Sequence, residues 1–114
     1  LFGARTPVEV LYADEFRAFA AATPGFRFHP CLSREGSAQP HPDERRGRVQ
    51  AMLAELAPDP ARDIAYLCGN PEMVDACFGL LKDAGLPVPA IRREKYVSPP
   101  DPKARSAGLA VVSE

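Results

Sequence analysis

The strongest constraint on the fold is an apolar run that passes directly into a helix start. Residues 64–68 carry no charge, which is typical of a central strand of a parallel sheet, buried on both faces. Asn70 and Pro71 follow closely, and they suit a helix cap and the first helical position. A buried strand that leads into a helix is the repeating unit of α/β proteins, so this run predicts a parallel sheet.

The rest of the chain repeats this alternation of strand and helix. Apolar patterning predicts strands at 1–4, 26–32, 64–68 and 91–97, and helices over 6–20 (broken near Asp14), 48–56 and 70–85. Residues 33–47 are polar and predict a long loop. Because crossovers between parallel strands are right-handed, we expect a parallel sheet with helices on both faces.

The end of the chain has a different composition. Residues 98–114 begin with three prolines among the first five positions, and they predict a loose, flexible tail. We therefore expect one domain over 1–97 and a C-terminal tail over 98–114, since 114 residues suffice for one domain.

Composition argues against several classes of partner. The formal net charge is −1, which gives no support to nucleic-acid or membrane attraction. The three cysteines form no Cys-x-x-Cys and no pairing with histidines at ligand spacing, so we expect no metal site. An odd cysteine count, and apolar runs far shorter than the ~20 residues of a membrane span, predict a reducing, cytoplasmic setting.

Polar side chains gather where predicted strands end. Ser33 and Arg34 follow one strand, Arg5 follows another, and Arg48 begins a helix. Ligands of parallel sheets bind at the carboxyl ends of strands, and the guanidinium fork matches phosphate oxygens. The residues therefore predict a phosphate site. The alternative is that these arginines pair with neighbouring surface acids, namely Glu35, Asp43 or Glu44.

Cys68 ends the buried strand and precedes Gly69 and a helix start. Helix N-terminal amides bind anions and lower thiol pKa values, and glycine lets a ligand approach the backbone. The alternative is a structural cysteine buried in the core. We expect the other two cysteines, Cys31 and Cys77, to be core residues.

These same segments resemble the ferredoxin–NADP reductase family. Residues 68–74, Cys-Gly-Asn-Pro-Glu-Met-Val, are similar to its Cys-Gly-Asn-Pro-x-Met motif. Residues 2–5, 32–35 and 47–49 resemble its Gly-x-Arg, Val-Ser-Arg-Glu and Gly-Arg-Ile/Val motifs, and 91–97 resembles its last strand. The resemblance runs in the family's order from residue 1 to about residue 97.

The resemblance implies a phosphate-binding role for four residues. In the family, the Ser and Arg of Ser-Arg-Glu bind the 2′-phosphate that distinguishes NADP from NAD, and they correspond to Ser33 and Arg34. Arg48 and Arg5 correspond to arginines that assist in many bacterial members.

The resemblance also implies which residues lie near the nicotinamide end of the cofactor. Cys68 corresponds to the cysteine beside the nicotinamide during hydride transfer, and Gly69, Asn70 and Met73 would line the dinucleotide site. Tyr96 is the nearest match to the aromatic residue that covers the flavin. Family chains commonly end at that aromatic residue, whereas this chain continues. Cys68 and Tyr96 are thus the candidate catalytic residues.

The implied function is an NADP(H)-dependent flavin oxidoreductase. NADPH would pass hydride to FAD, and electrons would pass on to a ferredoxin, a flavodoxin or another acceptor. Two alternatives remain: a nucleotide-binding or complementing module without activity of its own, and the reductase component of an oxygenase.

Two family features have no match in these 114 residues. One is the flavin-binding barrel with its Arg-x-Tyr-Ser/Thr motif, and the other is the first strand with its Gly-Thr-Gly-x-Ala-Pro turn. The resemblance thus implies a partial NADP-binding domain that lacks its first strand, needs a flavin-binding domain as partner, and is inactive alone. Since that strand is central in the family, its absence leaves unpaired backbone groups unless another segment fills the gap.

Overall fold

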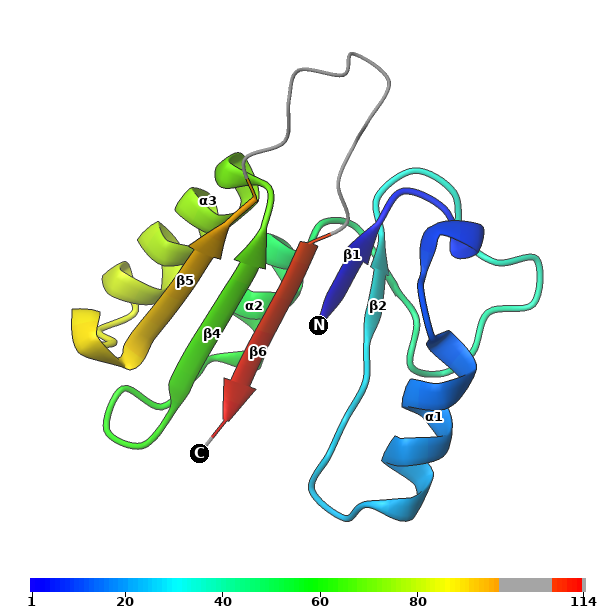
Figure 1. Ribbon diagram of the computed structural model, residues 1–114, viewed down its shortest axis with the longest axis horizontal. Coiled ribbons are helices and arrows are strands. Elements are labelled where there is room, and N and C mark those ends of the chain that lie inside the picture. Colours follow the sequence, from blue (N-terminus) through cyan, green and yellow to red (C-terminus); the bar gives the residue numbers. More distant parts are fainter. Residues whose placement is uncertain (97–107, 114) are drawn as a thin grey trace.

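The structure, a computed structural model, describes residues 1–96 and 108–113. One six-stranded sheet forms its centre, in the order β3-β2-β1-β6-β4-β5 (Figure 1). The strands are β1 (Phe2–Ala4), β2 (Pro30–Leu32), β3 (Arg45–Arg46), β4 (Ile64–Gly69), β5 (Ile91–Lys95) and β6 (Gly108–Ser113). The helices are α1 (Ala13–Ala22), α2 (Val49–Leu56) and α3 (Pro71–Asp83), with 3-10 turns η1 (Pro7–Glu9) and η2 (Val88–Ala90).

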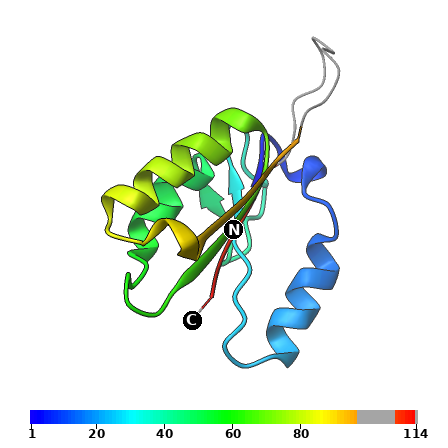
Figure 2. The ribbon, with the colours of Figure 1, turned by 60° about the vertical axis from the view of Figure 1, so that its left-hand side comes forward.

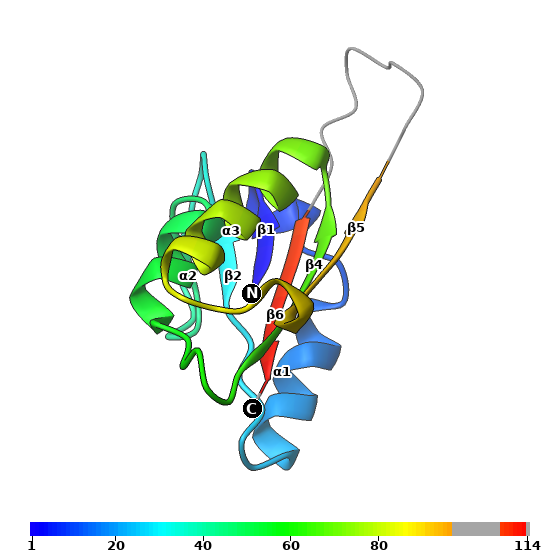
Figure 3. The same cartoon turned by 90° about the vertical axis from the view of Figure 1, so that its left-hand side faces the viewer.

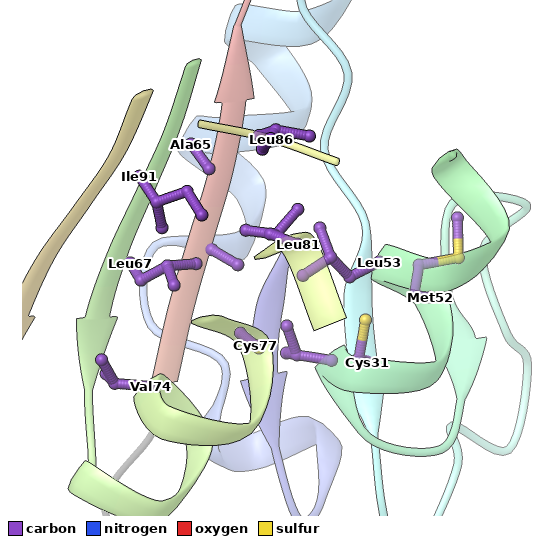
Figure 4. Close-up of a cluster of buried hydrophobic side chains, with 12 residues drawn as sticks. Cys31, Met52, Leu53, Ala65, Leu67, Val74, Cys77, Leu81, Leu86 and Ile91 are labelled. Carbon is purple, nitrogen blue, oxygen red and sulfur yellow. The ribbon is translucent and has the colours of Figure 1, made fainter. Parts of the chain in front are cut away.

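The helices lie on both sides of the sheet, which confirms the α/β fold predicted from the alternation. Helices α2 and α3 cover one face, while α1 lies on the opposite side (Figures 2 and 3). The core fills the space between the sheet and the α2–α3 layer, with Leu53, Leu67, Cys77 and Leu81 among its buried members (Figure 4). No helix in the described part of the chain is long and apolar enough to cross a membrane.

Strand β6 corrects the prediction of a loose tail. Residues 108–113 run antiparallel to both β1 and β4 and lie between them. The expectation is wrong for this segment because its apolar stretch supplies the backbone partners that β1 and β4 would otherwise lack. Residues 97–107 and 114, the remainder of the expected tail with Val97 of the expected last strand, lie outside the described residues.

Strand β6 also fills the gap that the missing first strand was expected to leave in the sheet. The neighbouring strand pairs β1–β2 and β4–β5 are parallel, as predicted, and the pair β2–β3 is parallel as well. The gap expected in the sheet is closed by a segment that follows these strands in the chain and runs in the opposite direction.

The segment 26–32 contains less strand than predicted. Only Pro30–Leu32 pairs in the sheet. The aromatic side chains before it pack on α1 instead: Phe28 stacks on Phe16 with ring centroids 5.1 Å apart, and Phe26 meets Phe19 at 4.8 Å. Helix packing therefore accounts for part of the alternation that suggested a longer strand.

The predicted break in helix 6–20 is confirmed, whereas the predicted loop 33–47 needs correction. The helix divides into η1 and α1, and the junction residue Tyr12 adopts a left-handed conformation with φ of 56°. The break thus precedes Asp14. The loop contains the two-residue strand β3, which pairs with β2 through the register Cys31–Arg45 and Leu32–Arg46.

Candidate functional site

A cavity of about 940 Å³ lies at the carboxyl edge of the parallel strands. Its walls come from the residues that follow β1 and β2, from the starts of α2 and α3, and from the first residue of β6. Figure 1 shows that β1 and β4 end at this same edge. The volume lies in the range of small-molecule sites. Six of the predicted site residues line it: Arg5, Ser33, Arg34, Arg48, Asn70 and Met73.

Backbone hydrogen bonds hold the ends of β1 and β2 together. The Ser33 amide donates to the Ala4 carbonyl at 3.0 Å, and the Arg34 amide donates to the Arg5 carbonyl at 3.0 Å. These bonds extend the parallel pairing beyond the strands. They bring Arg5, which is distant in sequence, to the same wall of the cavity as Ser33 and Arg34.

Arg48 reaches the same wall through a turn at Gly47. The Gly47 amide donates to the Leu32 carbonyl at 2.8 Å, and Gly47 has a φ of 120°, a conformation that favours glycine. Arg48 then caps α2 with an extended backbone. The predicted helix start is therefore confirmed, and its capping residue lines the cavity.

The guanidinium groups of Arg34 and Arg48 are exposed. Within residues 1–96 and 108–113, neither forms an ion pair. Two of the acids suggested as surface partners are engaged elsewhere: Asp43 pairs with Arg17 at 2.8 Å, and a Glu44 oxygen accepts the Ser37 amide at 2.9 Å. The two arginines keep their donors available to the cavity.

Arg5 differs, because its guanidinium is held by Glu9. Nε and Nη2 of Arg5 both donate to the Glu9 carboxylate. These hydrogen bonds to the Arg5 side chain lower the pKa of Glu9 below its ordinary value. The sequence signal for this ion pair is the spacing of four residues between Arg5 and Glu9.

The start of α3 forms the opposite wall. Asn70 Oδ1 accepts the Met73 amide at 3.1 Å, so the predicted cap is confirmed. Met73 borders Gly108 of β6, where a Cβ atom would lie 2.5 Å from the Met73 methyl carbon. Gly69 has a φ of 141° and precedes this wall without lining the cavity. Sequence reasoning had no basis for Gly108, because its position depends on β6.

Cys68 and Tyr96 also lie outside the cavity lining, and they contact each other. Cys68 Sγ lies 2.9 Å from Tyr96 Oη, and the Tyr96 amide donates to the Gly69 carbonyl at 2.7 Å. The hydrogen bond with Cys68 raises the pKa of Tyr96 above its ordinary value. The two candidate catalytic residues are therefore brought together at the end of β4.

The other two cysteines are buried, as predicted. Cys31 and Cys77 are 1% and 0% exposed, whereas Cys68 is partly exposed. Burial raises the pKa of Cys31 and raises that of Cys77 to about 11. Cys68 is thus the cysteine with access to solvent, which departs from the alternative of a fully buried core residue.

Nine further residues line the cavity without having been predicted as site residues: Gly3, Ala4, Glu9, Leu11, Cys31, Val49, Gln50, Glu72 and Gly108. Glu72 lies in the first turn of α3. Among the described residues, no cluster of three or more His, Cys, Asp and Glu side chains is placed to hold a metal ion.

Comparison with known proteins identifies similar chains. Residues 1–78 match the family described as the oxidoreductase NAD-binding domain. The reductase component of propane 2-monooxygenase from Rhodococcus jostii (strain RHA1) is 37% identical over 102 residues, which cover 86% of this chain and 27% of that protein. Ferredoxin–NADP reductase B from Sorangium cellulosum (strain So ce56) is 35% identical over 104 residues, covering 84% of this chain and 41% of that protein.

A solved structure has a similar fold. The crystal structure of the Amycolatopsis cytochrome P450 reductase GcoB matches with a TM-score of 0.66 and 32% identity. The match covers 82% of this chain and 27% of that one. This chain therefore spans between about a quarter and two fifths of the length of these three proteins.

Proposed function

Because the chain belongs to the oxidoreductase NAD-binding domain family, we propose that the cavity at the carboxyl edge of its sheet binds NADP(H). One observation carries the proposal. Ser33 and Arg34 follow β2, Arg48 caps α2, and all three line one cavity, where the two guanidinium groups are unpaired within the described residues. A 2′-phosphate would satisfy these donors.

The phosphate contacts set the choice of cofactor. A phosphate monoester carries nearly two negative charges, and each charge-assisted hydrogen bond contributes roughly 1.5–3 kcal/mol. NAD sites usually place an acidic side chain on the ribose hydroxyls at the corresponding strand end. This chain has Ser33 and Arg34 there first, which favours NADP over NAD.

The end of β4 and the start of α3 would hold the nicotinamide half. NADP(H) supplies the hydride chemistry, while the chain supplies position and electrostatics. The capped first turn of α3 borders the cavity, where Asn70 and Met73 shape the wall. The contact with Tyr96 orients the Cys68 thiol at the end of the strand.

The protein's whole activity would require further parts. FAD would be held by a flavin-binding domain, and electrons would pass from it to a ferredoxin, flavodoxin or other acceptor. The chain itself would bind nucleotide and lack reductase activity alone. An oxygenase as the acceptor is the second candidate, supported by the relative that is a propane 2-monooxygenase reductase component.

Calorimetric titration of the purified chain with NADP⁺ and with NAD⁺ tests the proposal. We expect NADP⁺ to bind more tightly, and we expect neither a flavin absorbance spectrum nor dye reduction with NADPH. Binding of neither nucleotide would defeat the proposal and favour a complementing module. A stoichiometric flavin spectrum would contradict the placement of FAD outside this chain.

A further inference from the structure

We propose that Glu9 is a specificity-determining residue, which weakens the cavity's preference for a phosphate by occupying Arg5. The inference rests on the proposed function, because it concerns the same cavity. Both side chains line it. Each keeps about a third of its surface exposed, 32% for Arg5 and 31% for Glu9, so a ligand and solvent reach the pair.

The two carboxylate oxygens of Glu9 have separate tasks. Oε2 accepts the backbone amides of Arg5 at 3.0 Å and Thr6 at 3.2 Å, together with Arg5 Nε at 3.3 Å. These bonds cap the turn η1. Oε1 accepts Arg5 Nη2. Oε2 therefore stabilises the backbone of the turn, and Oε1 completes the ion pair by accepting Arg5 Nη2.

The pair divides the cavity's arginines into two kinds. Arg34 and Arg48 have no ion-pair partner among the described residues and present full positive charges. Arg5 lies on the same wall with its charge balanced by a carboxylate. An anionic ligand must either displace Glu9 from Arg5 or bind close to the Glu9 charge. Both alternatives weaken the binding of a phosphate. They weaken the binding of a ligand that ends in a ribose hydroxyl less.

Glu9→Gln tests this inference with little structural change. An amide oxygen in place of Oε2 still accepts the two backbone amides, while the amide nitrogen in place of Oε1 releases Arg5 Nη2. We expect NADP⁺ to bind E9Q about three- to tenfold more tightly than the wild-type chain, with the Kd for NAD⁺ changed less than about twofold. Calorimetry gives both constants, and the Tm reports any loss of the cap.

Glu72→Gln is the matched control. Glu72 also lines the cavity and loses the same charge, but it accepts no hydrogen bond from Arg5 among the described contacts. We expect a smaller gain in NADP⁺ affinity for E72Q. Equal gains in E9Q and E72Q would overturn the proposal, since they would reflect only the net charge of the cavity.

Arg5→Gln completes a double-mutant cycle. In the wild-type background the substitution leaves the Glu9 carboxylate unpaired in the cavity, so we expect NADP⁺ to bind about three- to tenfold more weakly. In the E9Q background it should abolish the gain. Should E9Q fail to fold, the double variant R5Q/E9Q, which leaves neither charge unpaired, still decides: a loss of NADP⁺ affinity beyond about tenfold relative to the wild-type chain would overturn the proposal.

The outcomes separate this inference from the proposed function. A wild-type chain that binds neither nucleotide defeats the proposed function and the inference together. A wild-type chain that binds NADP⁺, with an unchanged or weaker affinity in E9Q, defeats the inference alone. That second result would make Glu9 a cap, or a residue that holds Arg5 in position for the phosphate.

Discussion

The half of the sheet around β4 and α3 differs from the half around β1, β2 and α1. Strand β4 has six residues and α3 has 13, with Val74, Cys77 and Leu81 of the helix buried. Strands β1 and β2 have three residues each, and every residue of α1 keeps part of its surface exposed. Yet Arg5, Ser33 and Arg34 all follow the short strands. The first half supplies most of the packing, and the second supplies most of the charge in the cavity.

The largest expected effect contrasts packing in the two halves. Leu81→Ala removes a side chain that is 1% exposed, and we expect it to lower the free energy of unfolding by about 3 kcal/mol. Phe19→Ala in α1 removes a side chain that is 53% exposed, and we expect a loss below about 1 kcal/mol. Urea unfolding measures both. Equal losses would show that α1 contributes to the core as strongly as α3.

Thiol reactivity sharpens the same contrast at three positions. Cys68 is partly exposed, whereas Cys31 and Cys77 are buried with raised pKa values. We expect iodoacetamide at pH 8 to modify Cys68 at least about 100-fold faster than the other two, because the thiolate is the reactive form. Mass spectrometry of peptides gives the three rates. Comparable rates in the native chain would contradict the burial of Cys31 and Cys77.

A smaller effect concerns the N-terminal cap of α3, which lies beside the cavity. Asn70→Ala removes the acceptor of the Met73 amide, and we expect a loss of about 1 kcal/mol in unfolding free energy. Asn70→Asp keeps an acceptor and serves as the control. If both variants unfold like the wild-type chain, the hydrogen bond at this helix start contributes nothing measurable.

The half around β4 was predictable because its signals are local. The predicted strand 64–68 and helix 70–85 correspond to Ile64–Gly69 and Pro71–Asp83, since the apolar run, Asn70 and Pro71 act on adjacent residues. Strand β6 was not predictable in this way. Its pairing depends on β1 and β4, which lie far away in the chain. The prolines within 98–102 favoured a loose tail instead of a strand.

The candidate site was predictable where topology alone determines position. Ser33 and Arg34 follow a parallel strand, so the rule that ligands bind at carboxyl ends was enough to predict their edge of the sheet. The pairing of Arg5 with Glu9 needed a side-chain conformation, which the spacing permits but does not determine. Gly108 lies in the cavity wall because β6 pairs with β1, and that pairing was not predicted.

The central claim is that the unpaired arginines after β2 and at the start of α2, Arg34 and Arg48, select a phosphate. Its most direct test is the pair of dissociation constants for NADP⁺ and NAD⁺ in the wild-type chain and in Arg34→Ala and Arg48→Ala. Arg92→Ala is the control, because Arg92 is an exposed residue of β5 outside the cavity lining. We predict that R34A and R48A each weaken NADP⁺ binding by about tenfold and NAD⁺ binding by less than about twofold, with R92A unchanged. Equal losses for the two nucleotides, or a wild-type chain that prefers NAD⁺, would contradict the account.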